Sequence, residues 1–383
     1  MRALETLAVH AGRIHPAPAG AIATPIYQTS TFGHSGDGDY DGVRYSRLSN
    51  GPNQLAVARK VAALCGQEAA VITASGMAAI STALLAFVKA GERVLFQRGV
   101  YGGTHMLATE DLPRLGIAAD FAPDDDPAHW RDAVRPETRV IYVEAISNPL
   151  VKIIDLPAVV RLARETGTLA VIDATFASPV NLRPVDLGFD LELHSATKYL
   201  NGHSDLIAGA VCGSGERIRE VVHKLNHLGG CLDPHACFLL ERGLKTLPLR
   251  VRQQNKNALG LARFFAARGD VAAVHYPGLD PSRLPGGLAA HFTGFGGVLA
   301  VELVGGAERA DRVLASLALA THAPSLGGPE TLVTRPATTS HAGLVPAERR
   351  ALGIGDGLIR IACGIEDTDD LAADFAQALD AQL

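Results

Sequence analysis

Short apolar runs alternate with helical stretches along most of this 383-residue chain, and that alternation limits the folds open to it. The runs are rich in Val, Ile and Leu and read "EAAVITASG", "RVLFQ", "RVIYVEAIS", "LAVIDATF", "LELHSATK" and "LIAGAVCG". Stretches with helical spacing, such as "QLAVARKVAALC" and "PAVVRLARETG", separate several of them. Strands that are apolar throughout and spaced by helices predict an α/β fold with a mainly parallel sheet and helices on both faces.

The character of the sequence divides the chain into three parts. Residues 1–48 are rich in Pro, Gly and Thr and predict an extended arm that wraps its own domain or reaches a partner. Residues 49–245 hold the alternating pattern and predict a large domain. Residues 246–383 combine helical stretches with the strands "FGGVLAVELVGG" and "GLIRIACGI", which predicts a smaller C-terminal α+β domain.

Bulk composition excludes several classes of protein. Apolar residues make up 47% of the chain and charged residues 20%, as in an ordinary soluble globular protein. The net charge is -5 and Lys and Arg do not cluster, so a nucleic-acid partner has no electrostatic support. Apolar stretches are interrupted before they reach about 18 residues, so we expect no membrane span. The first residues lack the apolar core of a signal peptide, and the five cysteines form no Cys-x-x-Cys pair. We therefore expect a cytoplasmic protein with reduced thiols.

A group of His and Cys residues raises the question of a metal site. His223 and His227 lie four residues apart on a predicted helix, a spacing at which two imidazoles can share a zinc ion. Cys231, His235 and Cys237 follow, but the Gly and Pro residues of "GGCLDPHACF" break the helix and scatter these side chains. We therefore expect packing roles for them and no metal site.

The predicted sheet carries an unusual set of residues where its strands end. Ser75, Asn148, Asp173 and Lys198 each lie at the end of an apolar run, and such sheets bind ligands outside the carboxyl ends of their strands. A lysine in a dry crevice is destabilised as a cation, so the pKa of its amine falls and the amine becomes nucleophilic. Such an amine forms a Schiff base with an aldehyde, and pyridoxal 5'-phosphate (PLP) is the commonest aldehyde cofactor.

The chain offers a partner for each other part of that cofactor. The pyridine nitrogen needs a carboxylate, and Asp173 ends an apolar strand 25 residues before Lys198. The phosphate needs backbone N–H groups at a helix start, which "ASGMAA" supplies, and hydroxyl donors, which Ser195 and Thr197 supply. Tyr101 can cover the ring and offer a phenolic proton. Together these residues predict a PLP site at the strand ends.

The order of motifs along almost the whole chain resembles the Cys/Met-metabolism family of PLP-dependent enzymes. This family includes cystathionine γ-lyase, cystathionine γ-synthase, methionine γ-lyase and the homoserine-ester sulfhydrylases. The matching blocks are, in family order, "ETLAVHAG", "TPIYQTSTF", "YSR", "ASGMAAI", "YGGT", "SNPL", "DATFASP", "HSATKYLNGHSD", "SLGGPETL" and "GIGDGLIRIACGIED". The resemblance implies PLP-dependent transferase fold type I, similar to aspartate aminotransferase, in a homotetramer built from dimers.

The resemblance also implies roles for individual residues. Lys198 would hold the cofactor as a Schiff base and move protons, Asp173 would pair with the ring nitrogen, and Tyr101 would stack on the ring. The implied phosphate contacts are Gly76, Met77, Ser195, Thr197 and, from the neighbouring subunit, Tyr45 and Arg47. The implied substrate contacts are Arg360, which would grip the α-carboxylate, Ser325, and Asn148, which would also lie near the cofactor 3-hydroxyl.

Three positions depart from the family pattern in ways that bear on the substrate. Pro324 stands where cystathionine-cleaving members commonly have Glu, Arg44 where many members have an acidic residue, and Met106 where an Arg is frequent. The usual polar contacts to the far end of a substrate are thus mostly missing. This favours a smaller or more apolar thioether such as methionine. Arg44, however, keeps a substrate with an anionic group at its far end among the alternatives.

The resulting hypothesis is a PLP-dependent C–S lyase of sulfur amino-acid metabolism. It would perform γ-elimination on a methionine- or cystathionine-like substrate and give a 2-oxo acid, ammonia and a thiol. The same residues serve γ-replacement, in which an incoming thiol takes the place of the leaving group, so a cystathionine γ-synthase or homoserine-ester sulfhydrylase stays open. A third possibility is a binding protein that kept the fold without the chemistry.

Overall fold

The computed structural model describes residues 2–33, 43–340, 342–343 and 345–381. Within these residues the larger sheet has seven strands, in the order β1-β7-β6-β5-β4-β2-β3. Their bounds are β1 Ala69–Thr73, β2 Arg93–Phe96, β3 Ala118–Phe121, β4 Thr138–Glu144, β5 Leu169–Asp173, β6 Leu191–His194 and β7 Gly209–Gly213. β6, β5, β4, β2 and β3 pair in parallel, whereas β7 is antiparallel to both of its neighbours. The expected mainly parallel sheet is confirmed, with one reversed strand.

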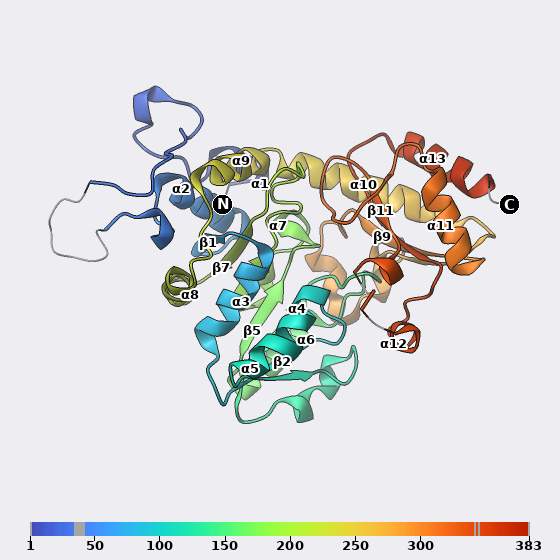
Figure 1. The fold of residues 1–383 in the computed structure, drawn as a ribbon, viewed down its shortest axis with the longest axis horizontal. Coiled ribbons are helices and arrows are strands. Elements are labelled where there is room, and N and C mark those ends of the chain that lie inside the picture. Colours follow the sequence, from blue (N-terminus) through green and yellow to red (C-terminus); the bar gives the residue numbers. More distant parts are fainter. Residues whose placement is uncertain (1, 34–42, 341, 344, 382–383) are drawn as a thin grey trace.

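Helices cover both faces of this sheet, which explains why its strands are apolar throughout (Figure 1). Apolar side chains on one face pack against α2 (Pro52–Cys65), α6 (Leu156–Thr166), α7 (Ser178–Asn181) and α9 (Pro234–Leu244). The other face packs against α3 (Gly76–Phe87), α5 (Leu112–Arg114) and α8 (Gly215–Leu228), with α4 (Gly102–Met106) preceding α5. Gly66 ends α2 with a φ of 67°, a left-handed conformation that favours glycine.

The reversal of β7 follows from the connection before it. Residues 195–208 join β6 to β7 through turns, without the helix that usually carries a chain across to a parallel strand. The chain therefore turns back beside β6, and Lys198 lies in the turn at the end of the sheet.

The smaller sheet has the strand order β10-β11-β12-β9-β8 within the described residues. Its strands are β8 (Val271–His275), β9 (Val298–Leu303), β10 (Thr321–His322), β11 (Leu332–Thr334) and β12 (Leu358–Ala362). The sequence predicts β9 and β12, whereas β8, β10 and β11 are additional. Helices α10 (Leu247–Ala266), α11 (Gly306–Ser316) and α13 (Thr368–Asp380) form a core with this sheet, and α12 (Pro346–Ala351) precedes β12. Figure 1 shows α10 running from the large sheet toward the small one. The domain boundary near residue 245 stays a prediction.

The N-terminal arm contains a helix, α1 (Leu4–His10), where the sequence showed no clear periodicity. The buried Lys60 on α2 secures it, because Nζ of Lys60 donates a hydrogen bond to the carbonyl oxygen of Ala8 at 2.9 Å. Residues 34–42 of the predicted arm lie outside the described residues. None of the described helices is long and apolar enough to cross a membrane.

Candidate active site

A cavity of about 680 Å³ opens where β1, β4, β5 and β6 end, and residues beside and on β12 close it from the smaller sheet. Its size is typical of small-molecule sites. The structure brings together most of the residues singled out in the sequence, because the cavity is lined by Gly76, Met77, Tyr101, Asn148, Asp173, Ser195, Thr197, Lys198, Ser325 and Arg360.

Lys198 presents its amine inside this cavity. Its Nζ donates a hydrogen bond to Oγ of Ser325 at 2.7 Å. Burial, together with the positive charge of Arg360, lowers the pKa of Lys198 to about 8. Ser325 holds an unusual backbone conformation for a residue with a side chain, with a φ of 99°. The amine is therefore neutral in a larger fraction of molecules than a solvent-exposed lysine would be.

Two carboxylates lie next to each other at the ends of β4 and β5, where the buried Glu144 is the register partner of the half-buried Asp173. Burial raises the pKa of Asp173, although the Thr175 hydroxyl and the backbone N–H of Thr175, which donates to Oδ1 at 2.9 Å, oppose this rise. Burial and the charge of Asp173 raise the pKa of Glu144 to about 8. The sequence reading missed Glu144, although it ends an apolar strand just as Asp173 does, and that signal could have identified it.

Helix α3 directs its N-terminus toward the cavity. Oγ of Ser75 caps the helix by accepting a hydrogen bond from a backbone N–H of the first turn at 3.0 Å. Gly76 lies so close to the β6–β7 turn that a Cβ there would be 2.8 Å from Cβ of Ser195. Oγ1 of Thr197 bonds both backbone groups of Ala208, at 3.1 and 3.0 Å, which fixes the turn. Backbone N–H groups and hydroxyls thus converge on one end of the cavity.

Arg360 brings a buried positive charge to the cavity from the smaller sheet. Its side chain lies on β12, and the residue is 6% exposed. The guanidinium donates to Oδ1 of Asn148 at 3.2 Å and to the carbonyl oxygen of Ser325 at 2.9 Å. Burial lowers the pKa of Arg360 to about 10, so it stays charged at neutral pH. Its Nε is buried without a hydrogen-bond partner among the described residues. Arg360 itself lines the cavity, where its guanidinium can meet a bound carboxylate.

Tyr45 and Arg47 do not line the cavity of their own chain. Nη1 of Arg47 donates to the carbonyl oxygen of Asn226 on α8 at 2.8 Å, and its guanidinium lies 5.6 Å from the centre of the Tyr45 ring. Both residues lie in the N-terminal segment before α2, and Tyr45 is exposed. A contribution to the neighbouring subunit's phosphate site therefore stays a prediction.

The three positions that depart from the family pattern lie in different parts of the structure. Pro324 lines the cavity, as do the apolar residues Ile207 and Leu326. Met106 is exposed on α4, and the Arg44 guanidinium lies 5.7 Å from the centre of the Phe32 ring. Further lining residues that the sequence reading did not name are Ile80, Ile146, Thr175, Phe176, Thr334, Thr339 and Ser340.

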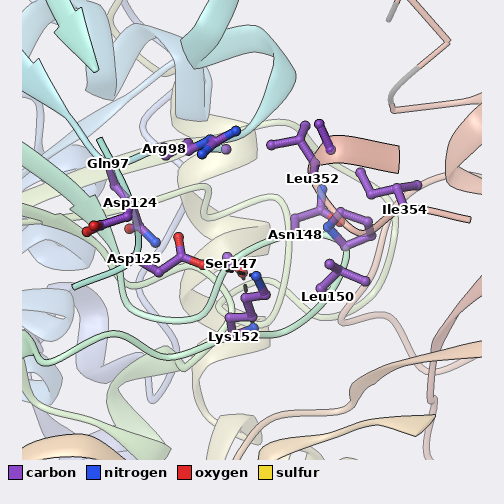
Figure 2. A pocket seen from close by; sticks show the side chains of 13 residues that line it. Gln97, Arg98, Asp124, Asp125, Ser147, Asn148, Leu150, Lys152, Leu352 and Ile354 are labelled. Carbon is purple, nitrogen blue, oxygen red and sulfur yellow. Dashed lines mark hydrogen bonds and ion pairs between the residues drawn. The ribbon is translucent and has the colours of Figure 1, made fainter. Parts of the chain in front are cut away.

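A second cavity, of about 150 Å³, lies between the loop after β4 and the segment that follows α12 (Figure 2). Its carboxylates already have partners: Asp125 pairs with Nζ of Lys152 at 2.9 Å, and Asp124 pairs at 2.7 Å with His129, which lies outside the lining. Asn148 lines both cavities. The larger cavity is therefore the candidate active site.

Comparison with known proteins assigns the chain to a family. The model of the Cys/Met metabolism PLP-dependent enzymes matches residues 5–380. The chain belongs to this family. It is 41% identical to cystathionine gamma-lyase of Bacillus subtilis, over 98% of this chain and 99% of that one. It is 39% identical to L-methionine gamma-lyase of Porphyromonas gingivalis, over 98% of this chain and 96% of that one.

A solved structure confirms the fold expected for a PLP-dependent enzyme of type I. The crystal structure of cystathionine gamma-lyase from Lactobacillus plantarum, complexed with L-serine, superimposes with a TM-score of 0.92. The two chains are 35% identical, and the match covers 99% of each. The expected family and its cofactor, PLP, are thus confirmed.

The cavity of this chain fits the family's cofactor. The half-buried Asp173 has a carboxyl pKa raised by desolvation, so a protonated ring nitrogen would offset that cost. The start of α3 offers N–H groups suited to a phosphate, and the close approach of Gly76 to Ser195 keeps that end free of side-chain bulk. The Lys198 amine is the nucleophile that an aldehyde requires.

Proposed function

We propose that this family member is a C–S lyase that performs γ-elimination on a methionine- or cystathionine-like amino acid. The products would be a 2-oxo acid, ammonia and a thiol. The observation that carries the proposal is the convergence of Lys198, Ser325 and Arg360 in one cavity, with a low-pKa amine hydrogen-bonded beside a buried guanidinium. That arrangement suits an amino acid whose carboxylate meets Arg360 while its Cα faces the amine.

We assign the cofactor to the residues that converge at the strand ends. Asp173 would pair with the ring nitrogen, Lys198 would bind the aldehyde carbon, and Tyr101 would cover the ring. When bound, PLP supplies an electron sink for the negative charge left at Cα of the substrate. The phosphate contacts in our assignment are Gly76, Met77, Ser195, Thr197 and the neighbouring subunit's Tyr45 and Arg47, with Asn148 near the 3-hydroxyl.

The residues of the chain divide the work on the substrate. Arg360 binds the α-carboxylate, helped by Asn148 and Ser325, whose contacts to the guanidinium fix its orientation. Lys198 accepts the proton from Cα and then moves protons at Cβ, which the pKa of about 8 permits near neutral pH. Tyr101, whose ring lines the cavity, donates a proton to the departing sulfur.

Three apolar residues of the cavity lining support an uncharged thioether as substrate. Pro324 offers no hydrogen-bond donor or acceptor from its side chain, and Ile207 and Leu326 are its apolar companions in the lining. A substrate with a second charged group would lose hydration there without gaining a partner from these three residues. Methionine satisfies this condition better than cystathionine does.

We further propose a homotetramer built from dimers, in the cytoplasm, with an arm over 1–48, a PLP-binding domain over 49–245 and a smaller domain over 246–383. The separation of Tyr45 and Arg47 from their own cavity supports an oligomer in which each arm serves a neighbour.

A substrate panel tests the proposed reaction. The purified holoenzyme is incubated with methionine, cystathionine and O-acylated homoserine, with and without an added thiol, and the products are identified by mass spectrometry. We expect 2-oxobutanoate, ammonia and methanethiol from methionine, and little effect of the added thiol. A Lys198→Ala variant should show neither turnover nor the absorbance of a lysine-bound cofactor.

Other product patterns would replace the proposal. Thioether formed from acylated homoserine and thiol, faster than any 2-oxo acid, would assign the chain to γ-replacement. Pyruvate and homocysteine from cystathionine would assign it to β-elimination. A protein without bound cofactor and without any of these products would be a binding protein that kept the fold.

A further inference from the structure

Three side chains of types that can bind a metal ion meet in the apolar core between the large sheet and α2. Within the part of the chain that the structure describes, Cys65, Glu192 and His194 place their ligand atoms within 4.8 Å of one another. Their exposed fractions are 0%, 0% and 1%. They lie outside the lining of the active-site cavity, although β6 leads directly into the turn that carries Lys198.

The fold brings these donors together from separate elements. Glu192 and His194 are two residues apart on β6, so their side chains point to the same face of the sheet. Cys65 is the last residue of α2, which packs on that face. Cys212 on β7 is the register partner of Glu192, and its thiol lies close enough to that of Cys65 to raise the pKa of the Cys65 thiol. No spacing in the sequence reveals such a site, because its residues are far apart in the chain.

The distances and the unsatisfied atom suit a small divalent cation. Sγ of Cys65 lies 3.6 Å from Nε2 of His194, close to the ~3.5 Å expected between sulfur and nitrogen ligands on a tetrahedral zinc ion. Oε1 of Glu192 lies 2.7 Å from the same nitrogen. It needs to move by roughly 0.6 Å to reach the distance expected between an oxygen and a nitrogen that bind one zinc ion. Oε2 of Glu192 is buried without a hydrogen-bond partner among the described residues, which is costly unless a cation uses it.

We propose that Cys65, Glu192 and His194 form a buried structural site for a zinc ion, with both carboxylate oxygens of Glu192 as ligands. Loading releases two protons, one from the Cys65 thiol and one shared by Glu192 and His194. The thiolate and the carboxylate then balance the two charges of the ion, so the core stays neutral. The Cys212 thiol remains as a hydrogen-bond donor to the coordinated sulfur. The ion would join α2 to β6 and stiffen the strand that precedes Lys198.

Metal content and sulfur ligation test the site directly, independently of the proposed reaction. The full chain is produced with zinc in the medium, and a second sample is unfolded and refolded with zinc because the site is closed in the folded state. After dialysis against a chelator, we expect about one zinc per chain, with one sulfur at about 2.3 Å and nitrogen or oxygen at about 2.0 Å by X-ray absorption. Cys65→Ser should lose the sulfur signal and most of the zinc.

Matched controls distinguish this site from surface binding. Cys231 lies outside the cluster and is only half-buried, so Cys231→Ser should keep the full zinc content. His223 and His227 lie on α8 with ring centres 4.5 Å apart, and zinc held there would show no sulfur. Wild-type protein without zinc in both preparations, zinc without a sulfur ligand, or an unchanged zinc signal in Cys65→Ser would each overturn the proposal. If Cys65→Ser does not fold, the absorption spectrum of the wild type decides alone.

Discussion

Arg360 lines the cavity with a guanidinium whose hydrogen bonding is incomplete. The side chain is buried on β12, two of its nitrogens already donate to Asn148 and Ser325, and Nε has no partner among the described residues. Leaving such a donor unpaired costs about 1–3 kcal/mol. A carboxylate can accept two parallel hydrogen bonds from a guanidinium, so a bound amino acid offers Arg360 a charge-assisted partner in the cavity.

Replacing Arg360 with lysine should therefore weaken the substrate complex while leaving the charge. An ammonium cannot reach Asn148, Ser325 and the carboxylate together, because it lacks the planar arrangement of donors. We expect kcat/KM to fall roughly 100-fold, mostly through a higher KM. The matched control is Arg312→Lys, whose exposed pair with Glu308 on α11 lies away from the cavity. Unchanged kinetics in Arg360→Lys would remove this residue from carboxylate binding.

The individual site residues could be predicted from the sequence only where a chemical requirement singled them out. Lys198 and Asp173 were found because a lysine and a carboxylate at strand ends answer two demands of one cofactor. Glu144 answers none of those demands and was missed, although it ends β4 in register with Asp173. Its place at a strand end is visible in the sequence, but its position beside Asp173 follows only from the pairing of β4 with β5.

At the scale of elements, the start of α3 depends on its close approach to the β6–β7 turn. A Cβ on Gly76 would lie 2.8 Å from Cβ and 3.0 Å from Cα of Ser195, and a backbone neighbour cannot rotate away. Gly76→Ala should therefore push the helix start off the turn and separate the groups proposed to bind the phosphate. The cavity would keep its shape elsewhere, because the strands themselves are unchanged.

We expect Gly76→Ala to weaken cofactor binding by roughly tenfold or more, equivalent to at least ~1.4 kcal/mol. The measurement is a titration of cofactor-stripped protein with PLP, followed by absorbance. Gly269→Ala is the matched control, since a Cβ added there would have no atom within 4 Å and its φ is not positive. Equal affinities for the two variants would show that the α3 start does not bind the phosphate.

The contact between α1 and α2 has a pH dependence of its own. Burial lowers the pKa of Lys60 to about 8 in the folded chain, against 10.5 for a free lysine. The unfolded chain therefore holds more protons between these two values, and the free energy of unfolding rises with pH across that window. The stabilisation is absent below about pH 8 and complete above the unfolded pKa.

Lys60→Met should remove this rise in stability. We expect the wild type to gain stability relative to the variant between about pH 8 and about pH 10, measured by urea unfolding at one protein concentration. Lys256→Met, on the exposed face of α10, serves as the control and should follow the wild type. A constant difference between wild type and Lys60→Met across this range would mean that Lys60 keeps its proton in the fold.

Elements were predictable in proportion to how fully they are buried. β4 and β5 are buried on both faces of the large sheet, so their apolar runs identified them. β3 and β8 are mostly half-buried edge strands that carry little such signal, and both were missed. The direction of β7 was also beyond the sequence pattern, because an apolar run does not state which way its neighbours run.

At the scale of the whole molecule, the positions of Tyr45 and Arg47 bear on how two chains associate. Their motif matches the family, yet neither residue reaches the cavity of its own chain, and Arg47 contacts the backbone of α8 instead. Exposed apolar side chains occur in the same N-terminal part, including Ile22 at 79% exposure. A symmetric dimer in which each N-terminal segment covers the partner would bury such side chains and deliver Arg47 to the partner's cavity.

Complementation between two inactive variants tests this arrangement. Lys198→Ala lacks the reactive amine and Arg47→Ala lacks the proposed phosphate contact, so each variant alone should be nearly inactive. In a mixed dimer, one site combines the intact Lys198 of the Arg47→Ala chain with the intact Arg47 of the Lys198→Ala chain. Random reassembly of equal amounts should therefore restore about a quarter of the wild-type activity. Reassembled mixtures that contain mixed dimers by mass spectrometry but stay inactive would place Arg47 in the site of its own chain or outside the site altogether.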